Sequence, residues 1–436
     1  NASGLAFVNR QRSYRNQIGR RADPAYDNPV WVMNNNRDRS EVDRFVASTQ
    51  LDITPTDWLI LTARAGVDHY SNRLQTFFPV NSAGTNNTGS LQLQTPRETQ
   101  FNADFFARGN WKVGNVLDLG ALVGANMNQR SSDNVGGTTN TFIITSDVPL
   151  NLNNAISTNR VPFNSFTQQR TGAVYGTLNA GYKGQLFLNM TGRAESASTY
   201  GRAQSPTYFY PSADVAWQFT KSFGMTGKAL SFGKLRAGFG KVATQPTPYN
   251  TATYYGSSAY GESWGSVVNS SAYGGGYEQS SILGNSGLRP EVKTEIEFGG
   301  DFRFMQDRIN LGVTYFTNNV KDVLLPVSLA ASTGFTNRTA NAAALQNRGV
   351  EIELNGDVIR AGDFRWNLYS NWSRIRNKVT DLSGTSSLFL AGFTGTSSRA
   401  VLGQPVGVLW GVDFLRDEKG TLTLDAGAGF DSYAWS

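Results

Sequence analysis

Two short segments match enzyme motifs, and each motif acts only in a particular structural context. Residues 261–265, GESWG, match the G-x-S-x-G pattern of a nucleophilic serine on a strand–turn–helix. Such a serine needs a histidine as base, and the chain's single histidine, His69, lies far upstream. Residues 238–243, GFGKVA, match a dinucleotide fingerprint that must open a helix, yet the proline-rich residues 244–248 follow. We therefore expect no catalytic residue and no bound dinucleotide.

Composition removes most metal and cofactor chemistry. The chain has no cysteine, which excludes disulfides, iron–sulfur clusters and thiolate zinc sites. We expect His69 to be a structural polar residue, and the Asp/Asn-rich loops lack the spacing of a calcium-binding EF-hand. No metal and no cofactor is therefore predicted.

Positive charge does not indicate a nucleic-acid partner. The net charge is +6, but the arginines are scattered instead of forming one basic stripe. We interpret the N-terminal group as solvated loop or lumen wall, with acidic lipopolysaccharide binding as the weaker alternative. This group comprises Arg10, Arg12, Arg15, Arg20 and Arg21.

The remaining candidates are charged residues that alternate with apolar ones. In a barrel they would face the lumen, and in a soluble sandwich they would face solvent. We expect the pair Glu295 and Glu297 to bond neighbouring strands or an internal domain, with direct substrate contact as the alternative. The lumen-facing candidates are Arg64, Asp68, Asp104, Arg108, Arg193, Glu195, Glu295, Glu297, Asp301 and Arg303.

The elements that position these residues have a period of two, which is typical of half-buried strands. Short turn signals join the alternating segments into pairs, as in β-hairpins. We predict six hairpins, and hence about twelve strands of roughly ten residues. The paired segments are 45–53 with 59–67, 101–111 with 117–125, 174–182 with 186–194, 213–219 with 235–239, 294–304 with 309–315, and 350–354 with 364–372.

The connections alternate between short and long, which is typical of a transmembrane antiparallel β-barrel. The long ones are predicted at 70–100, 128–170, 243–286 and 321–347, rich in Ser, Thr, Asn and Gly. Trp217 and Phe302 are expected to face lipid at mid-depth. An aromatic girdle is expected near the strand ends, formed by Trp58, Trp111, Tyr182, Phe219, Phe304 and Phe364. The fold class is therefore all-β; a soluble β-sandwich is the alternative.

Several segments together resemble one family, the SusC/RagA class of TonB-dependent outer-membrane transporters. The segment LRPE at 288–291 is similar to a signature found across TonB-dependent receptors. The other segments follow in family order along nearly the whole chain. They are NPVW (28–31), NNNR (34–37), TDWL (56–59), LNMTGR (188–193), YFYPS (208–212), LSFGKLR (230–236), QNRGVE (346–351) and NWS (371–373).

The resemblance implies an active importer in the outer membrane of a Gram-negative, Bacteroidetes-like bacterium. Residues 1–436 would form part of a barrel of about 22 strands, with long extracellular loops. We expect the plug domain and the closing strands to lie outside this sequence. Implied partners are outer-membrane lipid, a SusD-like lipoprotein and, through a missing N-terminal region, the TonB complex. The transporter–lipoprotein pairs are expected to form dimers.

The implied function is import of a large nutrient, an oligosaccharide or an oligopeptide, without enzymatic activity. Three alternatives stay open. A passive porin, or a self-contained barrel of twelve strands, would need neither plug nor energy. A transporter-like barrel would serve as a scaffold in an envelope complex, and a soluble carbohydrate-binding protein would need no detergent.

Overall fold

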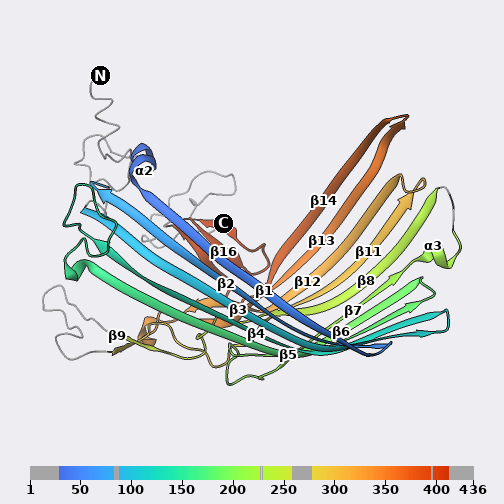
Figure 1. Cartoon of the computed structure of the whole chain (residues 1–436), viewed down its shortest axis with the longest axis horizontal. Coiled ribbons are helices and arrows are strands. Elements are labelled where there is room, and N and C mark those ends of the chain that lie inside the picture. Colours follow the sequence, from blue (N-terminus) through green and yellow to red (C-terminus); the bar gives the residue numbers. More distant parts are fainter. Residues whose placement is uncertain are drawn as a thin grey trace, which may run out of the picture. The chain divides into compact units, whose positions relative to one another are not determined.

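The computed structural model describes residues 29–82, 88–225, 227, 229–257, 277–393 and 396–411. Antiparallel strands make up most of this part (Figure 1). The main sheet has the hydrogen-bonded order β1-β2-β3-β4-β5-β6-β7-β8-β11-β12-β13-β14. Its strands are β1 (Arg37–Thr56), β2 (Leu59–Val80), β3 (Thr88–Val113), β4 (Leu117–Asn140), β5 (Arg160–Tyr182), β6 (Leu186–Ala197), β7 (Tyr208–Trp217), β8 (Leu230–Thr244), β11 (Glu291–Phe304), β12 (Ile309–Ser328), β13 (Asn337–Ala361) and β14 (Phe364–Asp381).

Smaller elements lie before, between and after these strands. Two strands, β9 (Tyr255–Ser257) and β10 (Tyr277–Gln279), pair with each other. A separate three-stranded sheet comprises β15 (Ser387–Phe393), β16 (Thr396–Val401) and β17 (Val408–Gly411). The helices are short, namely α2 (Pro29–Asn35), α3 (Phe219–Ser222) and the 3₁₀ turns η2 (Ser157–Asn159) and η3 (Ala331–Thr333). Within the described ranges, none of the helices has the length and apolarity to cross a bilayer.

The chain divides into two compact units. The first comprises Asn1–Asp52, Thr62–Phe105 and Asn126–Thr171. The second comprises Ile53–Leu61, Phe106–Ala125 and Gly172–Ser436. Each has a small apolar core, around Leu91 with Phe77 and Phe142 in the first and around Val379 with Leu382 in the second.

The predicted hairpins are present. Five of the six have short turns, whereas the link between β7 and β8 runs from Gln218 to Ala229 and contains α3. At the β5–β6 turn, Lys183 and Gly184 have φ values of 53° and 61°, the left-handed region that suits a two-residue hairpin turn. The neighbouring turns are hydrogen-bonded to this one. The Lys183 N–H donates to the Val116 oxygen at 2.7 Å, and the Gln218 N–H donates to the Gln185 oxygen at 2.7 Å.

The predicted strand length of roughly ten residues is wrong for most of the sheet. Only β7 has 10 residues, whereas β3 has 26. Three of the predicted long loops, at 70–100, 128–170 and 321–347, consist mostly of strand. The strands that continue into them are β2, β3, β4, β5, β12 and β13. Polar side chains pair across these extensions, for example Asn134 with Gln94 at 3.1 Å. Alternating polarity is required only beside lipid, so polar ladders beyond it carry no periodic signal.

The prediction that Phe219 belongs to a strand is also wrong. β7 ends at Trp217, and Phe219 opens the helix α3 in the link to β8. Its ring lies against Gly233, where an added Cβ would be 2.2 Å from the Phe219 ring. The ring therefore packs on the strand from a helix, a position that alternation cannot reveal.

Register places apolar and charged residues on opposite faces of the sheet. Phe298 of β11 pairs with Ala237 of β8 and Tyr315 of β12. One residue earlier, Glu297 pairs with Gly238 of β8. Successive side chains of a strand point to opposite faces, so the residues of Phe298 parity form the apolar face and those of Glu297 parity form the polar face.

Candidate functional site

An ion-pair group occupies the polar face of β8 and β11 in the second unit. Lys234 Nζ is 2.8 Å from Asp301 Oδ2, and Arg236 Nε is 3.8 Å from the same oxygen. Arg236 also donates to Glu297 and to Thr314. Its guanidinium lies over Gly299, where a Cβ would come within 2.7 Å of it. Glycine at this position therefore gives the arginine room to reach both carboxylates.

Replacing Arg236 with methionine tests this group. Both side chains of the Arg236–Glu297 pair are about one-third exposed, at 34% each, so solvent screens the attraction. We expect a double-mutant cycle with Glu297→Gln to give a coupling energy of about 0.2–1 kcal/mol in urea unfolding. A coupling below about 0.2 kcal/mol would contradict the contact, and the same cycle between Arg236 and Glu291, at the other end of β11, is the control.

A polar hollow of about 470 Å³ adjoins the group. Arg236 and Asp301 line one part of it, and Glu351, Glu353 and Tyr369 line another. Glu351 pairs with Thr314 of β12, and Glu353 pairs with Gly312. Both glutamates are therefore on the polar face. The hollow thus has one cation beside three carboxylates and two aromatic rings, a surface suited to positively charged or hydrogen-bonding ligands.

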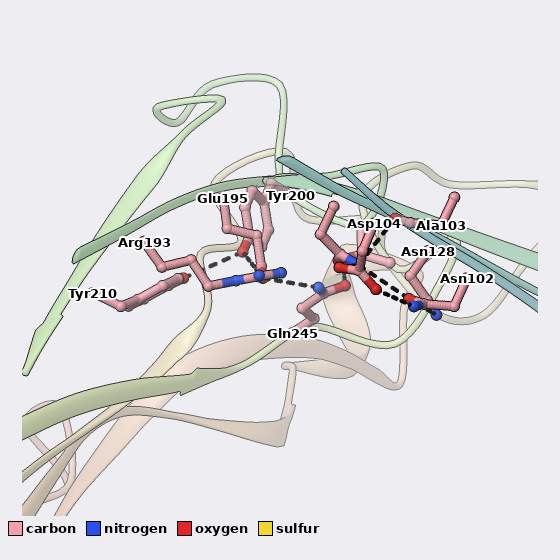
Figure 2. Close-up of polar contacts among 11 residues, drawn as sticks. Asn102, Ala103, Asp104, Asn128, Arg193, Glu195, Tyr200, Tyr210 and Gln245 are labelled. Atoms are coloured by element: carbon pink, nitrogen blue, oxygen red, sulfur yellow. Dashed lines mark hydrogen bonds and ion pairs between the residues drawn. The ribbon is translucent and has the colours of Figure 1, made fainter. Parts of the chain in front are cut away.

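A second polar group surrounds Glu195 at the end of β6 (Figure 2). Arg193 Nη2 lies 2.8 Å from Glu195 Oε2. Gln245, just past β8, donates from Nε2 to Glu195 Oε1 at 3.1 Å, and the Tyr200 hydroxyl donates to the same oxygen at 3.4 Å. Tyr200 and Tyr210 hydroxyls are 3.3 Å apart. Glu195 therefore joins β6 to the segment that follows β8 and to the connection between β6 and β7.

Burial gives this second group its rigidity. The Glu195 side chain is only 14% exposed. Tyr200, in the β6–β7 connection, is buried. Burial, followed by its contacts with Tyr210 and Glu195, raises the pKa of Tyr200 above its ordinary value. The hydroxyl therefore stays protonated and donates at any physiological pH.

The β6–β7 connection is docked on the segment that precedes β11. The Gly201 N–H donates to the Leu288 oxygen at 2.8 Å, and the Ala203 N–H donates to the Ser286 oxygen at 3.0 Å. Leu288 is fully buried, and Arg289 forms an ion pair with Asp322 of β12. The LRPE segment is thus an anchor for a connection more than 80 residues earlier in the chain.

The predicted candidates of the first unit make their own contacts. Arg44 binds Asp68 through two hydrogen bonds, of 3.0 Å and 2.6 Å. Arg64 donates to Gln50 at 3.0 Å. Asp104 accepts from Asn102 and from Asn126, each at 2.8 Å, in the amide group also drawn in Figure 2. Except for the bond between Asn102 and Asp104, both on β3, these are local links between neighbouring strands, and the structure does not gather them into one site.

The other predicted candidates lie in the second unit. Glu295 is 2.7 Å from Lys293 of the same strand and accepts from Asn318 of β12 at 3.3 Å, while Glu297 pairs with Arg236 of β8. Arg108 and Arg303 lie over the rings of Phe106 and Phe232, at 5.7 Å and 4.8 Å.

Sequence reasoning missed several members of both groups. Lys234 and Arg236 alternate with Leu235, and this parity was a signal that could have added them. Gln245 and Tyr200 lie in connections without any period, so no pattern in the sequence marks them.

The rejected motifs have structural counterparts only in part. Residues 238–243 lie inside β8, so no helix follows the glycines. His69, on β2, makes a 2.8 Å hydrogen bond with Thr99, as expected of a structural polar residue. Residues 261–265 and the arginines at 10, 12, 15, 20 and 21 lie outside the described residues.

Comparison with curated proteins identifies relatives in two bacterial genera. TonB-dependent receptor P26 of Formosa agariphila is 25% identical over 416 residues, 92% of this chain and 40% of that protein. TonB-dependent receptor SusC of Bacteroides thetaiotaomicron is 25% identical over 228 residues, 50% of this chain and 22% of SusC. The chain thus spans less than half the length of these relatives, and both genera fit the predicted Bacteroidetes source.

Solved structures show the same fold. The RagAB peptide transporter structure matches with a TM-score of 0.76 at 20% identity, covering 93% of this chain and 43% of that one. The predicted barrel fold and the SusC/RagA resemblance are confirmed at this level. The family model described as TonB dependent receptor-like, beta-barrel matches residues 2–436. The chain belongs to this family of outer-membrane transporters and receptors.

Proposed function

We propose that the protein containing this chain imports an oligopeptide or oligosaccharide across the outer membrane, driven by the TonB complex. The observation that carries the proposal is the division of the sheet into an apolar face and a face of ion pairs, amides and a polar hollow. In a closed barrel, the first faces lipid and the second lines the path of a polar solute. Membership of the TonB-dependent family supports energy coupling.

The proposed assembly includes a SusD-like surface lipoprotein, with dimers of such pairs. Exposed aromatic residues in the connection between β8 and β11 support this arrangement, because a lid lipoprotein needs contact area there. The β9–β10 hairpin exposes Tyr255 and Tyr277 by 68% and 79%. Aromatic rings of this kind contribute contact area at protein and ligand interfaces.

Uptake by whole cells distinguishes the candidate functions. Cells carrying the intact gene receive a fluorescent decapeptide or an oligosaccharide of equal mass, with and without TonB. We expect one of the two to enter at least tenfold faster with TonB than without it. Equal entry without TonB would establish a passive porin. Absence of entry of either probe, together with co-purification of fixed envelope partners, would favour a scaffold. Protein that stays in water without detergent would favour the soluble alternative.

The hollow's carboxylates provide a variant for the same assay. Glu351→Gln with Glu353→Gln should slow a lysine-rich decapeptide several-fold relative to a neutral one, because two of the three carboxylates become uncharged. Glu98→Gln, which removes a carboxylate paired with Arg130 in the first unit, is the matched control. Equal slowing of both peptides by the double variant would exclude a charge role for the hollow.

A further inference from the structure

A groove of about 860 Å³ runs across the apolar face of the second unit. Gly109, Gly176 and Gly192 contribute no side chain to it, while Trp111, Leu178 and Phe209 form its walls. The pairing of residues between strands shows on which face of the sheet the groove lies.

Three register pairs connect the groove to β11. Met190 pairs with Ala213, Ala213 with Phe239, and Phe239 with Ile296. The first three of these residues line the groove, and Ile296 shares its parity with Phe298. The groove therefore lies on the apolar face, where the barrel meets lipid, and not on the polar face that holds the ion pairs.

The groove is open at Gly176, where a Cβ would meet only the Leu122 oxygen, at an ordinary 3.4 Å. At Gly109 and Gly192 the rings of Trp111 and Phe209 lie over the glycine, 2.4 Å and 3.0 Å from where a Cβ would be. The groove's lining is almost wholly hydrocarbon, so its occupant in a membrane is apolar.

Two lysines lie at the turn below the groove. Ala180 and Tyr182 follow Leu178 along β5 on the same face of the sheet. At a rise of about 3.3 Å per residue, Tyr182 is about 13 Å from Leu178. Lys183 Nζ is 5.2 Å from the centroid of the Tyr182 ring. Lys221 Nζ donates to the Gly184 oxygen at 3.1 Å. Both ammonium groups are thus at the same turn.

The surroundings of this turn match the level of lipid headgroups. Trp217, the last residue of β7, donates from its indole to Ser222 at 2.9 Å and packs edge-on against Phe223. Tryptophan and tyrosine gather where hydrocarbon meets water. Asp118 of β4 alternates with Leu117 and Leu119 and belongs to the polar face, so it does not neutralise the lysines from the lipid side.

We propose that the groove and the two lysines bind one phospholipid of the periplasmic leaflet. Its phosphate lies between Lys183 and Lys221, and one acyl chain passes Ala180 into the groove. The distance agrees with this placement, because about 13 Å along a tilted strand stays within one leaflet, roughly 15 Å deep. Charge complementarity selects a phospholipid over a neutral lipid.

Native mass spectrometry of the full-length detergent-purified transporter, titrated with phosphatidylglycerol, tests the proposal. We expect the first lipid to bind at least tenfold more tightly than the second. Gly176→Phe, which fills the groove, and the double variant Lys183→Gln with Lys221→Gln should each remove this preference. Lys241→Gln, at the other end of β8, should keep it. Diacylglycerol, which lacks the phosphate, should bind at least tenfold more weakly.

Three results would overturn the proposal. Evenly spaced affinities in the wild type would indicate exchangeable surrounding lipid only. Retained preference in the lysine double variant, or equal binding of diacylglycerol, would exclude recognition of the phosphate. A shift in gel mobility on heating verifies that each variant barrel is folded. If Gly176→Phe fails to assemble, the lysine double variant alone tests the proposal.

Discussion

Phe298→Arg should destabilise the membrane-inserted barrel by about 2–4 kcal/mol, the cost of a lipid-facing arginine near the bilayer midplane. Phe298 is 56% exposed on the apolar face and lies six residues before the end of β11 at Phe304. That is about 20 Å along the strand, and about 15 Å along the membrane normal at a tilt near 40°. The measurement is the free energy of unfolding in urea, determined for the wild type and for the variant in lipid vesicles.

Phe316→Arg is the matched control for this substitution. Phe316 pairs with Glu297 on the polar face, so an arginine there meets water and a carboxylate. We expect a loss of less than about 1 kcal/mol. Equal destabilisation by the two variants would contradict the assignment of the faces. Trp217 and Phe302, expected at mid-depth, instead lie at or near strand ends beside turns, where a charge costs only about 0–1 kcal/mol.

Gly201→Ala should release the β6–β7 connection from its anchor. A Cβ at Gly201 would lie 2.2 Å from the Ser286 oxygen and 2.7 Å from the Leu288 nitrogen, and both are backbone atoms that cannot rotate away. The two backbone hydrogen bonds from this connection, made by Gly201 and Ala203, must therefore break or lengthen. Trypsin cleavage after exposed Arg202 should accelerate at least tenfold, because proteolysis requires local opening.

Gly172→Ala provides the comparison, since a Cβ there meets nothing within 4 Å. Its cleavage rate should equal that of the wild type. An unchanged rate in Gly201→Ala would mean that the connection is not held at this point. Uptake of the transported probe in the same variants then shows whether a docked connection is required for import.

Much of the fold could be predicted because lipid imposes a strict rule on residues that cross it. Phe298 and Glu297 obey that rule, and the six predicted hairpins are all present. The rule ends where the membrane ends, so the polar pair Asn134 and Gln94 looked like loop although both are in strands. Phe219 was wrongly predicted to be in a strand because its position continues the alternation of β7 by chance, although the residue belongs to a helix.

The sites were less predictable than the strands. Parity identified Glu297 and Asp301, but the contacts that define their group depend on which strand lies beside them. β8 and β11 are neighbours in the sheet, although β9 and β10 lie between them in the sequence. Gln245 and Tyr200 reach Glu195 from irregular connections. Only three-dimensional proximity identifies such residues.

The pairing of Glu291 with Thr244 has a consequence for how this protein can diversify. The two ends of the β8–β11 connection are held by neighbouring strands, and β9 and β10 satisfy each other's hydrogen bonds. Lengthening a closed loop costs little, about 0.6 kcal/mol per doubling. An insertion within this connection should therefore cost little if Gln245 and residues 286–288 are kept, because they hold Glu195 and the β6–β7 connection. The turn at Lys183, hydrogen-bonded to the turns on both sides, leaves no such room.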